Sequence, residues 1–323
     1  MKTVILDGVT LNPGDNPWTP IEDLLPVTLY EKTEDEDIIQ RSKDAEILLT
    51  NKTPLTKETL EQLPNLKYIG VLATGYDVVD IKAAAERDIP VTNTPGYANN
   101  AVPEHVFALI FECYRQVSLH SQQVKDGEWG KNGQFCFWST SQRELGGKTI
   151  GIIGFGNTGN NVARIANGFG MNILAYAPRP KPMPSYDNFA YAPLKEVLEK
   201  SDIITLHCPL TEETKHIINE ETLALMKPDA IIINTARGPL LDEPAVAKAL
   251  NSGKLGGLAV DVVSEEPIAK DHPFLSTPNT FITPHLAWAT VEARTALMQI
   301  AADNIQAFLD GTPQNVVNGV TGK

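Results

Sequence analysis

Three side chains in the second half of the sequence could together perform acid–base chemistry beside a bound anion: Arg237, Glu266 and His285. Each follows a short apolar stretch that predicts a buried strand. The three apolar stretches are residues 231–233, 258–260 and 281–282. A guanidinium can hold a carboxylate and polarise a carbonyl, an imidazole can exchange a proton with the substrate oxygen, and a neighbouring carboxylate stabilises the imidazolium. Hydride transfer between a nicotinamide and a 2-hydroxy or 2-oxo acid requires these groups.

Each of the three residues also has a purely structural interpretation. Arg237 could form a surface ion pair, and Glu266 could be a solvated loop acid. A single histidine is more often structural than catalytic. Among the six histidines, however, only His285 follows a strand, lies next to a proline and comes shortly after an acidic pair. We therefore expect the three side chains to converge at one site.

Residues 149–159 predict a dinucleotide-binding turn, because an apolar β-branched run leads into Gly154-x-Gly156-x-x-Gly159 and then into a helical segment. Gly154 would allow the tight turn, Gly156 would let the backbone approach a pyrophosphate, and Gly159 would let the helix pack closely on the strand. The N–H groups at the helix start, at Asn157 and Thr158, would face the diphosphate. Glycine-rich turns also occur for packing alone, so the position between strand and helix carries this prediction.

The end of the next strand bears on the type of cofactor. About twenty residues after the glycines, where an acidic residue usually binds the adenosine ribose, the sequence reads Tyr-Ala-Pro-Arg-Pro-Lys over residues 176–181. The missing carboxylate at Ala177 removes repulsion toward a 2′-phosphate, and Arg179 could pair with that phosphate. The alternative is a solvated arginine and less selective NAD binding. The sequence favours NADP over NAD.

Short apolar runs alternate with amphipathic stretches around these residues, which predicts α/β folding with two doubly wound parallel sheets. One turn of the first half, Ala73-Thr74-Gly75, follows a strand and could offer N–H groups to an anion, or be a plain turn. The strands expected in the first half are residues 3–6, 27–30, 47–50, 68–72 and 91–93, with helices over 35–41, 57–63 and 79–87. Those of the second half are residues 150–153, 172–176, 203–206, 230–235, 257–262 and 280–282, with helices over 160–169, 194–200, 220–226 and 243–252.

Two long helices are expected outside this alternation, over residues 102–119 and 290–309. The second of them cannot form a domain alone, so we expect it to return to the first domain. The domains would then be residues 1–100 with 288–323, for the substrate, and 101–287, for the dinucleotide, with the active site in the cleft between them. The loop-like segment 125–145 carries the aromatic residues Trp129, Phe135, Phe137 and Trp138. They suggest a subunit contact, or a segment folded back on its own chain.

Composition limits the possible partners and location. A formal charge of −13 argues against nucleic acid or an anionic membrane as a partner, and an anionic substrate would need local cations. The first apolar run is too short for a signal peptide, and no stretch approaches membrane-spanning length. Cys113, Cys136 and Cys208 lie far apart without metal-ligand spacing, which predicts reduced thiols in a cytoplasmic protein and no metal site.

Four motifs in this order give the chain a resemblance to the D-isomer-specific 2-hydroxyacid dehydrogenases over nearly its full length. They are the glycine turn, residues 234–238, the Asp261-x-x-x-x-Glu266-Pro267 segment and residues 283–285. The resemblance implies a Rossmann domain inserted into a flavodoxin-like substrate domain, and a homodimer. It also implies that Arg237 binds and polarises the substrate, that His285 is the acid/base tuned by Glu266, and that Asp261 contacts the nicotinamide carboxamide. Further cofactor-binding residues implied in this way are Cys208, Pro209, Thr214, Thr235 and Ala236, and the implied substrate-carboxylate loop is Ala73-Thr74-Gly75.

Within the family, residues 50–53, 73–77 and 285–289 are most similar to glycerate dehydrogenases (hydroxypyruvate reductases). This similarity implies reduction of hydroxypyruvate, and often glyoxylate, to the D-hydroxy acid. Lys52 would supply a local positive charge, or be a solvated lysine. A phosphoglycerate dehydrogenase is the nearest alternative and would need basic residues for a phosphate. NAD(H)-sensing corepressors keep the same arginine, glutamate and histidine, so a binding protein is the alternative from another class.

Overall fold

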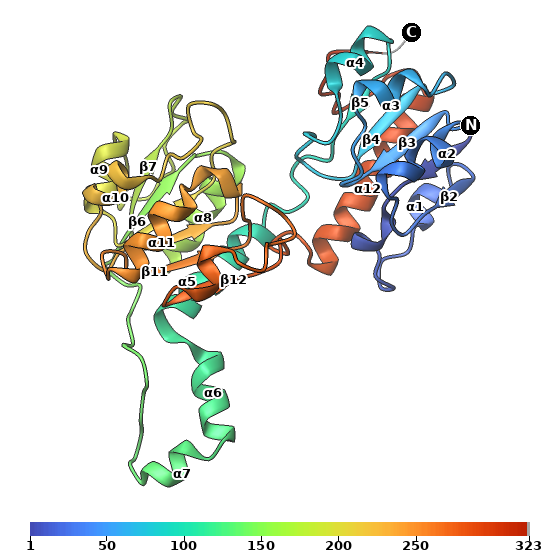
Figure 1. Cartoon of the computed structure of the whole chain (residues 1–323). Helices are drawn as coiled ribbons and strands as arrows, with labels where there is room; N and C mark the ends of the chain where they lie inside the picture. The colour runs from blue at the N-terminus through green and yellow to red at the C-terminus, as the bar shows by residue number, and fades with distance from the viewer. Residues whose placement is uncertain (322–323) are drawn as a thin grey trace. The chain divides into compact units, whose positions relative to one another are not determined.

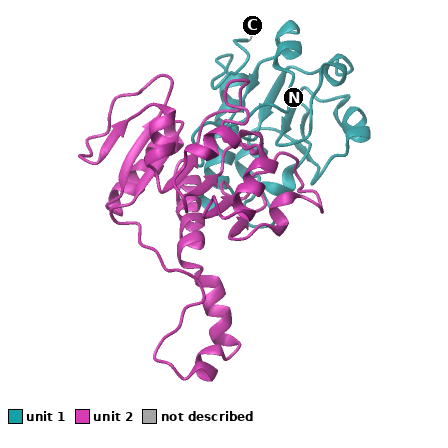
Figure 2. Ribbon diagram, turned by 60° about the vertical axis from the view of Figure 1, so that its left-hand side comes forward, with its two compact units in different colours: residues 1–98, 289–323 teal, residues 99–288 magenta. Residues whose placement is uncertain are grey.

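The structure is a computed structural model that describes residues 1–321 (Figure 1). Contacts within the chain divide it into two compact units, residues 1–98 with 289–323 and residues 99–288 (Figure 2). Among residues 1–321, no helix combines the length and the apolar character needed to cross a membrane. Both units are built on parallel sheets, so the predicted α/β fold class is confirmed.

The first unit contains a five-stranded parallel sheet in the order β2-β1-β3-β4-β5. This order is that of the flavodoxin-like doubly wound sheet. Strands β1, β3 and β4 are buried along their whole length, as expected where helices cover both faces. The strands are β1 (Thr3–Ile5), β2 (Val27–Leu29), β3 (Ile47–Thr50), β4 (Tyr68–Val71) and β5 (Val91–Thr92). The helices are α1 (Thr19–Glu22), α2 (Ile38–Ser42), α3 (Lys57–Glu61), α4 (Ile81–Glu86) and α12 (Val291–Leu309), with 3-10 turns η1 (Gly8–Thr10) and η2 (Asp35–Asp37).

Helix α12 belongs to this first unit and packs against α1 and β4. Its buried Arg294 makes two hydrogen bonds to the Asp15 carboxylate, at 2.6 and 2.8 Å, and a third to the Leu11 carbonyl at 3.1 Å. The guanidinium lowers the pKa of Asp15, chiefly through its hydrogen bond. The ring of Phe308, near the end of α12, lies 4.8 Å from that of Tyr68 in β4. Polar and apolar contacts at opposite ends therefore fix the helix.

The second unit contains a seven-stranded parallel sheet in the order β12-β11-β10-β9-β6-β7-β8. The consecutive residues of β10 show how the sheet is covered, since Ile231 and Ile233 lie in one hydrophobic layer and Ile232 in the other. The strands are β6 (Thr149–Ile153), β7 (Asn172–Tyr176), β8 (Phe189–Tyr191), β9 (Ile203–Leu206), β10 (Ile231–Asn234), β11 (Gly257–Val260) and β12 (Thr280–Ile282). The helices are α5 (Ala101–Arg115), α6 (Val117–Lys125), α7 (Glu128–Asn132), α8 (Asn157–Gly168), α9 (Leu194–Lys200), α10 (Glu220–Leu225) and α11 (Glu243–Asn251), with 3-10 turns η3 (Gly238–Leu240) and η4 (Pro273–Ser276).

The strand order of this sheet reverses at β6, which pairs with β7 on one side and β9 on the other. Ligands of open α/β sheets bind at the carboxyl ends of the strands, at such a reversal point. The glycine turn predicted from the sequence follows β6. The fold therefore puts that turn at the position where ligands bind in sheets of this kind.

Two expectations for residues 102–145 were wrong. The single helix predicted over residues 102–119 is divided at Gln116, whose left-handed backbone (φ 42) separates α5 from α6. Its side chain donates to Asn279 at 3.2 Å, so a tertiary contact accompanies a break that local sequence does not indicate. The segment predicted as a loop contains α7, bounded by the positive-φ glycines Gly127 and Gly133. Helices α6 and α7 and the return segment to residue 147, here called the arm, project from the second unit (Figures 1 and 2).

Candidate active site

The turn after β6 has the local geometry of a dinucleotide-binding turn. Gly154 has φ +97, and a Cβ there would collide with the backbone of His207 and Cys208. A Cβ at Gly159 would overlap the Gly154 carbonyl oxygen, so this glycine allows α8 to pack on the strand end. At Gly156, by contrast, no atom of residues 1–321 lies within 4 Å of an added Cβ, and none of their side chains caps the start of α8. The turn thus combines two tightly packed glycines with an open approach to uncapped N–H groups, which suits a pyrophosphate.

The segment after β9 lies against this turn. Burial raises the pKa of the Cys208 thiol to about 11, so the thiol is neutral. The Thr214 hydroxyl donates to the Pro209 carbonyl at 2.6 Å and accepts from the Thr211 N–H at 2.8 Å, which closes the following turn. Sequence reasoning missed His207, whose ring contacts the Thr205 hydroxyl at 2.8 Å. Burial lowers the pKa of His207 to about 3, so it adds no charge beside the glycine turn.

Arg237 lies on a turn after β10 that a buried asparagine holds in place. The Asn234 side chain donates to the Arg237 carbonyl at 2.9 Å and accepts from the Ala236 N–H at 3.0 Å. The Arg237 guanidinium donates to the Ala236 carbonyl at 2.7 Å. The Thr235 hydroxyl is buried without a hydrogen-bond partner among residues 1–321. Thr235 and the glycine turn both follow strands of this sheet and lie at the same edge of it. A buried hydroxyl without a partner at this edge is consistent with a bound cofactor.

His285 and Glu266 form the closest acid–base pair of this region, with His285 Nδ1 and Glu266 Oε2 2.6 Å apart. Because an ionised carboxylate only accepts hydrogen bonds, Nδ1 is the donor, and Nε2 is left to exchange a proton. The second oxygen of Glu266 accepts from the Val263 N–H at 3.2 Å. Both side chains remain partly accessible, at 28% for His285 and 37% for Glu266. The structure therefore brings together the two groups that the sequence separates by nineteen residues.

His285 has a left-handed backbone, with φ +54, which is unusual for a residue with a side chain. The buried Asp261 supports this conformation, because its carboxylate accepts from the Leu286 and Ala287 N–H groups at 2.9 and 2.8 Å. It also accepts from the Thr283 hydroxyl at 2.5 Å. Asp261 thus shapes the turn that carries His285.

His105 on α5 is a second histidine that the sequence analysis did not identify, and it contacts the residues of this turn. Its Nε2 is 3.0 Å from the Thr283 hydroxyl and 3.7 Å from Asp261 Oδ1. Burial lowers the pKa of His105, and the nearby Asp261 charge opposes that shift. The Thr283 hydroxyl already donates to Asp261, so His105 Nε2 must carry the proton. No local pattern marks this contact, since Thr283 lies 178 residues after His105.

The residues predicted to bind substrate in the first unit follow two neighbouring strands of its sheet. Lys52 is the second residue after β3, in a turn where the Asp7 carboxylate accepts from the N–H groups of residues 51, 52 and 53. The turn at Ala73, Thr74 and Gly75 follows β4, and the Thr74 hydroxyl donates to the Thr94 carbonyl at 3.0 Å. The Asn51 side chain joins the two segments by donating to the Leu72 carbonyl at 3.1 Å. Lys52 and the 73–75 turn therefore share one edge of the sheet.

Arg179 lies after β7 in an exposed, proline-rich segment. The segment is tied to β8 by a hydrogen bond from the Lys181 N–H to the Tyr191 hydroxyl at 3.1 Å. Ala177 packs at the edge of the hydrophobic core. Residues 177–186 contain no acidic side chain, so nothing in this segment would repel a phosphate.

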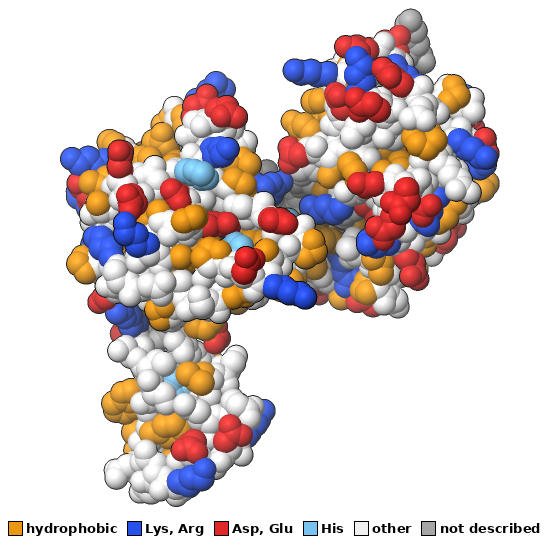
Figure 3. All heavy atoms as spheres, in the orientation of Figure 1, with side chains coloured by type: hydrophobic (Ala, Val, Ile, Leu, Met, Phe, Trp, Pro, Cys, Tyr) orange, Lys and Arg blue, Asp and Glu red, His pale blue; other side chains and the backbone are white. Residues whose placement is uncertain are grey.

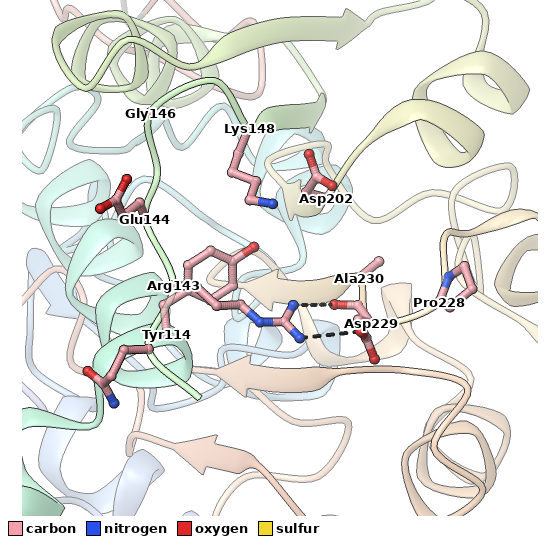
Figure 4. Close-up of a pocket in the computed structure, with 10 residues that line it drawn as sticks. Tyr114, Arg143, Glu144, Gly146, Lys148, Asp202, Pro228, Asp229 and Ala230 are labelled. Atoms are coloured by element: carbon pink, nitrogen blue, oxygen red, sulfur yellow. Dashed lines mark hydrogen bonds and ion pairs between the residues drawn. The ribbon is translucent and has the colours of Figure 1, made fainter. Parts of the chain in front are cut away.

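A cavity of about 540 Å³ lies at the opposite edge of the second sheet. Lys148, Asp202 and Ala230 line it (Figure 4), and each directly precedes a strand rather than following one. Its Arg143 is paired with Asp229, at 3.3 Å between Nη2 and Oδ2. The cavity is therefore separate from the edge that carries Arg237, Asp261 and His285.

The fold and the residues at the carboxyl ends of the second sheet's strands define a class of protein. A glycine turn suited to a dinucleotide, an arginine on an asparagine-held turn and a histidine–carboxylate pair all follow parallel strands of one sheet. Such a set can bind a nicotinamide dinucleotide and exchange a proton with an oxygen next to it. These are the functional groups that a nicotinamide-dependent oxidoreductase needs.

Comparison with known proteins identifies the family. Residues 107–287 match the family described as "D-isomer specific 2-hydroxyacid dehydrogenase, NAD binding domain". The chain is 46% identical to a hydroxypyruvate reductase of Blautia hydrogenotrophica, over 98% of this chain and 100% of that protein. It is 44% identical to a glycerate dehydrogenase of Methylorubrum extorquens, over 89% and 90% of the two chains. The chain belongs to the D-isomer-specific 2-hydroxyacid dehydrogenase family, as its motifs predict.

Solved structures agree with this assignment. A D-lactate dehydrogenase of Aquifex aeolicus, complexed with NAD and lactic acid, has a TM-score of 0.83 and 30% identity, covering 96% of each chain. An acyclic imino acid reductase in complex with NADPH and D-Arg has a TM-score of 0.85 and 33% identity, covering 98% of this chain and 100% of that one. The protein is therefore an oxidoreductase that uses a nicotinamide cofactor and reduces a 2-oxo acid to a D-2-hydroxy acid.

Proposed function

We propose that the protein is a hydroxypyruvate reductase, which reduces hydroxypyruvate, and also glyoxylate, to the D-2-hydroxy acid. Identity of 46% with a hydroxypyruvate reductase along the whole chain is the observation that carries this proposal. The names of other relatives, glycerate dehydrogenase and glyoxylate reductase, describe the same substrate class.

In this proposal each residue of the site has a defined task. Arg237 binds the substrate carboxylate and polarises its carbonyl group, and His285 donates the proton from Nε2 to the substrate oxygen. Glu266, which holds His285 Nδ1 at 2.6 Å, stabilises the imidazolium that must be present before the proton moves. Lys52 and the turn of residues 73–75 are proposed to bind the substrate carboxylate. The bound nicotinamide supplies the hydride.

The cofactor assignments from the sequence are part of the same proposal. The first N–H groups of α8, at Asn157 and Thr158, would bind the pyrophosphate, since no side chain of the described part of the chain caps this helix start. Asp261 is proposed to meet the nicotinamide carboxamide. The other proposed cofactor contacts are Cys208, Pro209, Thr214, Thr235 and Ala236.

An assay of purified protein with a panel of 2-oxo acids tests the function. The panel contains hydroxypyruvate, glyoxylate, pyruvate and 3-phosphohydroxypyruvate, each with NADH and with NADPH, and the loss of reduced nicotinamide is followed by absorbance. We expect the largest kcat/KM for hydroxypyruvate. A preference for the phosphorylated acid would favour a phosphoglycerate dehydrogenase, and cofactor binding without turnover would favour a sensor protein.

We propose that NADP is the preferred cofactor, because Ala177 removes the usual carboxylate and Arg179 offers a cation in a segment without acidic residues. The variant Ala177→Asp is expected to raise the NADH/NADPH ratio of kcat/KM by about tenfold or more, since the new carboxylate repels the 2′-phosphate and binds the ribose hydroxyls. Steady-state kinetics with both cofactors measure the ratio. Lys195→Ala, which removes an exposed lysine of the same unit, is the control. An unchanged ratio in Ala177→Asp would contradict the proposal.

We also propose that two copies of the chain associate through the arm. Hydrophobic side chains are exposed on it (Figure 3), including Phe135 at 93% and Trp138 at 66% exposed. Light scattering should give the mass of a dimer for the wild type and a monomer for Phe135→Ser/Trp138→Ser. Val9→Ser, at an exposed apolar residue outside the arm, should leave the dimer intact. A monomeric wild type would refute this part of the proposal.

We propose a cytoplasmic location for the protein. Cys113, Cys136 and Cys208 are unpaired, which is usual in a reducing compartment. Cell fractionation with an antibody against the protein would test the location.

A further inference from the structure

The loop that carries Glu266 is held at two points by one other carboxylate. Glu243, the first residue of α11, accepts from the Ser264 N–H through Oε1 at 2.8 Å. Its Oε2 lies 3.1 Å from Nε2 of His272. The two contacts bracket residues 265–271, so both ends of the loop are tied to the same rigid helix. Both side chains are largely buried, with 12% of Glu243 and 6% of His272 exposed.

The protonation of His272 follows from its second contact. Nδ1 of the ring accepts from the Phe274 N–H at 3.3 Å, so this nitrogen carries no proton. Nε2 must then be the protonated nitrogen, and it donates to Glu243. Both oxygens of Glu243 therefore accept hydrogen bonds. In His272, Nε2 donates and Nδ1 accepts.

A short path joins this pair to the acid–base centre. The N–H of Ser264 binds Glu243, and the N–H of the preceding residue, Val263, binds Glu266 Oε1 at 3.2 Å. The other oxygen of Glu266 contacts His285 at 2.6 Å. The backbone of Gly238, next to Arg237, packs directly against Val263 and Ser264 and leaves no space for a Cβ. A shift of the 263–264 backbone would therefore move the Glu266 carboxylate relative to His285.

We propose that Glu243 and His272 are positioning residues, which fix the Glu266 loop so that the Glu266 carboxylate stays on His285 Nδ1. Neither residue touches substrate or cofactor in this proposal, and both act through Glu266. The inference rests on the proposed acid–base role of His285 and Glu266. It adds two residues that maintain the imidazolium for proton donation.

The variant Glu243→Gln tests the proposal with little change in volume. Ser264 and His272 bind different oxygens of Glu243, and in glutamine an NH2 group replaces one of those oxygens, so one of the two donors then faces another donor. We expect kcat for 2-oxo acid reduction to fall by ten- to a hundredfold, the scale of a displaced catalytic group, with KM for the reduced cofactor unchanged. Reduction needs protonated His285, so a loosened carboxylate contact should also move the alkaline limb of the kcat profile to lower pH.

His272 contacts Glu243 through Nε2 and caps the Phe274 N–H through Nδ1, and two substitutions test these two roles separately. In His272→Gln the side-chain amide can reach Glu243 as Nε2 does, while in His272→Asn the shorter side chain can only cap the Phe274 N–H. The proposal expects His272→Gln to keep nearly full kcat and an unshifted pH profile. It expects His272→Asn to behave like Glu243→Gln. A purely structural capping role predicts the reverse order, and that result would overturn the proposal.

Glu220→Gln is the matched control, because Glu220 is also the first residue of a helix and also binds a side chain of α11, at 2.5 Å from Lys248. It lies on the exposed surface and should change neither kcat nor the pH profile. If Glu243→Gln fails to fold, the comparison of His272→Gln with His272→Asn decides alone.

A direct titration of His285 tests this inference independently of the proposed substrate. The Cε1–H signal of His285, assigned by its loss in His285→Asn, is followed against pH by NMR without any substrate. The pH at the midpoint of this titration curve should be lower in Glu266→Gln than in the wild type. In Glu243→Gln it should be lower by a smaller amount. Unmoved midpoints in Glu243→Gln and His272→Asn would refute the positioning role. Failure to reduce any 2-oxo acid would refute the proposed function alone.

Discussion

Replacement of His285 by asparagine is expected to reduce kcat for 2-oxo acid reduction by about 10²- to 10⁴-fold, the usual contribution of a general acid. Asparagine is preferred to alanine as the first variant because it tolerates the left-handed backbone found at this residue, with φ +54. Loss of activity then reports the missing proton donor rather than a rearranged turn. His285→Ala is expected to give the same loss. Steady-state kinetics with hydroxypyruvate measure the effect.

Binding of the reduced cofactor should be nearly unchanged in His285→Asn, because the glycine turn after β6 does not depend on the imidazole. Fluorescence titration of the reduced nicotinamide measures this affinity. His216→Asn is the control, since His216 also has a left-handed backbone (φ 52) and is exposed. A His285→Asn enzyme with wild-type turnover would show that another group donates the proton.

The strands of both sheets were predictable from the sequence where they are local apolar runs, whereas the short edge strand β8 (Phe189–Tyr191) was not predicted. The run of isoleucines 231–233 predicts a buried strand, and β10 occupies that place with successive side chains in opposite hydrophobic layers. The glycine triplet was predictable for a similar reason, since tight packing at Gly154 and Gly159 tolerates no Cβ. Each of these features depends on residues close together in the chain.

The features that escaped prediction depend on partners distant in the chain. Gln116 ends α5 while its side chain binds Asn279, 163 residues later. His105 contacts Thr283 across 178 residues, and Asp7 holds the backbone of Lys52 from 45 residues away. No local pattern marks such residues, because their role is set by the folded neighbours. The candidate acid–base pair was predictable only because strand ends of one sheet meet at one edge.

Removal of the Arg237 guanidinium is the second change with a large expected effect. Arg237→Ala should raise KM for the 2-oxo acid and lower kcat, because one group is proposed both to bind the carboxylate and to stabilise charge on the carbonyl oxygen. The combined loss in kcat/KM is expected to be about 10³-fold, the scale of removing one such donor together with a charged contact. Kinetics over a range of substrate concentrations separate the two parameters.

Two comparisons identify the guanidinium itself as the cause. Arg237→Lys keeps the charge but loses the planar pair of donors, so it should recover only part of the activity. Added guanidinium ion should partly restore Arg237→Ala and leave His285→Asn unaffected, because only the first variant lacks that group. Arg41→Ala, at an arginine that also donates to a main-chain carbonyl but lies in the first unit, should keep wild-type kinetics. An Arg237→Ala enzyme that lost cofactor affinity instead would place the guanidinium on the dinucleotide rather than on the substrate.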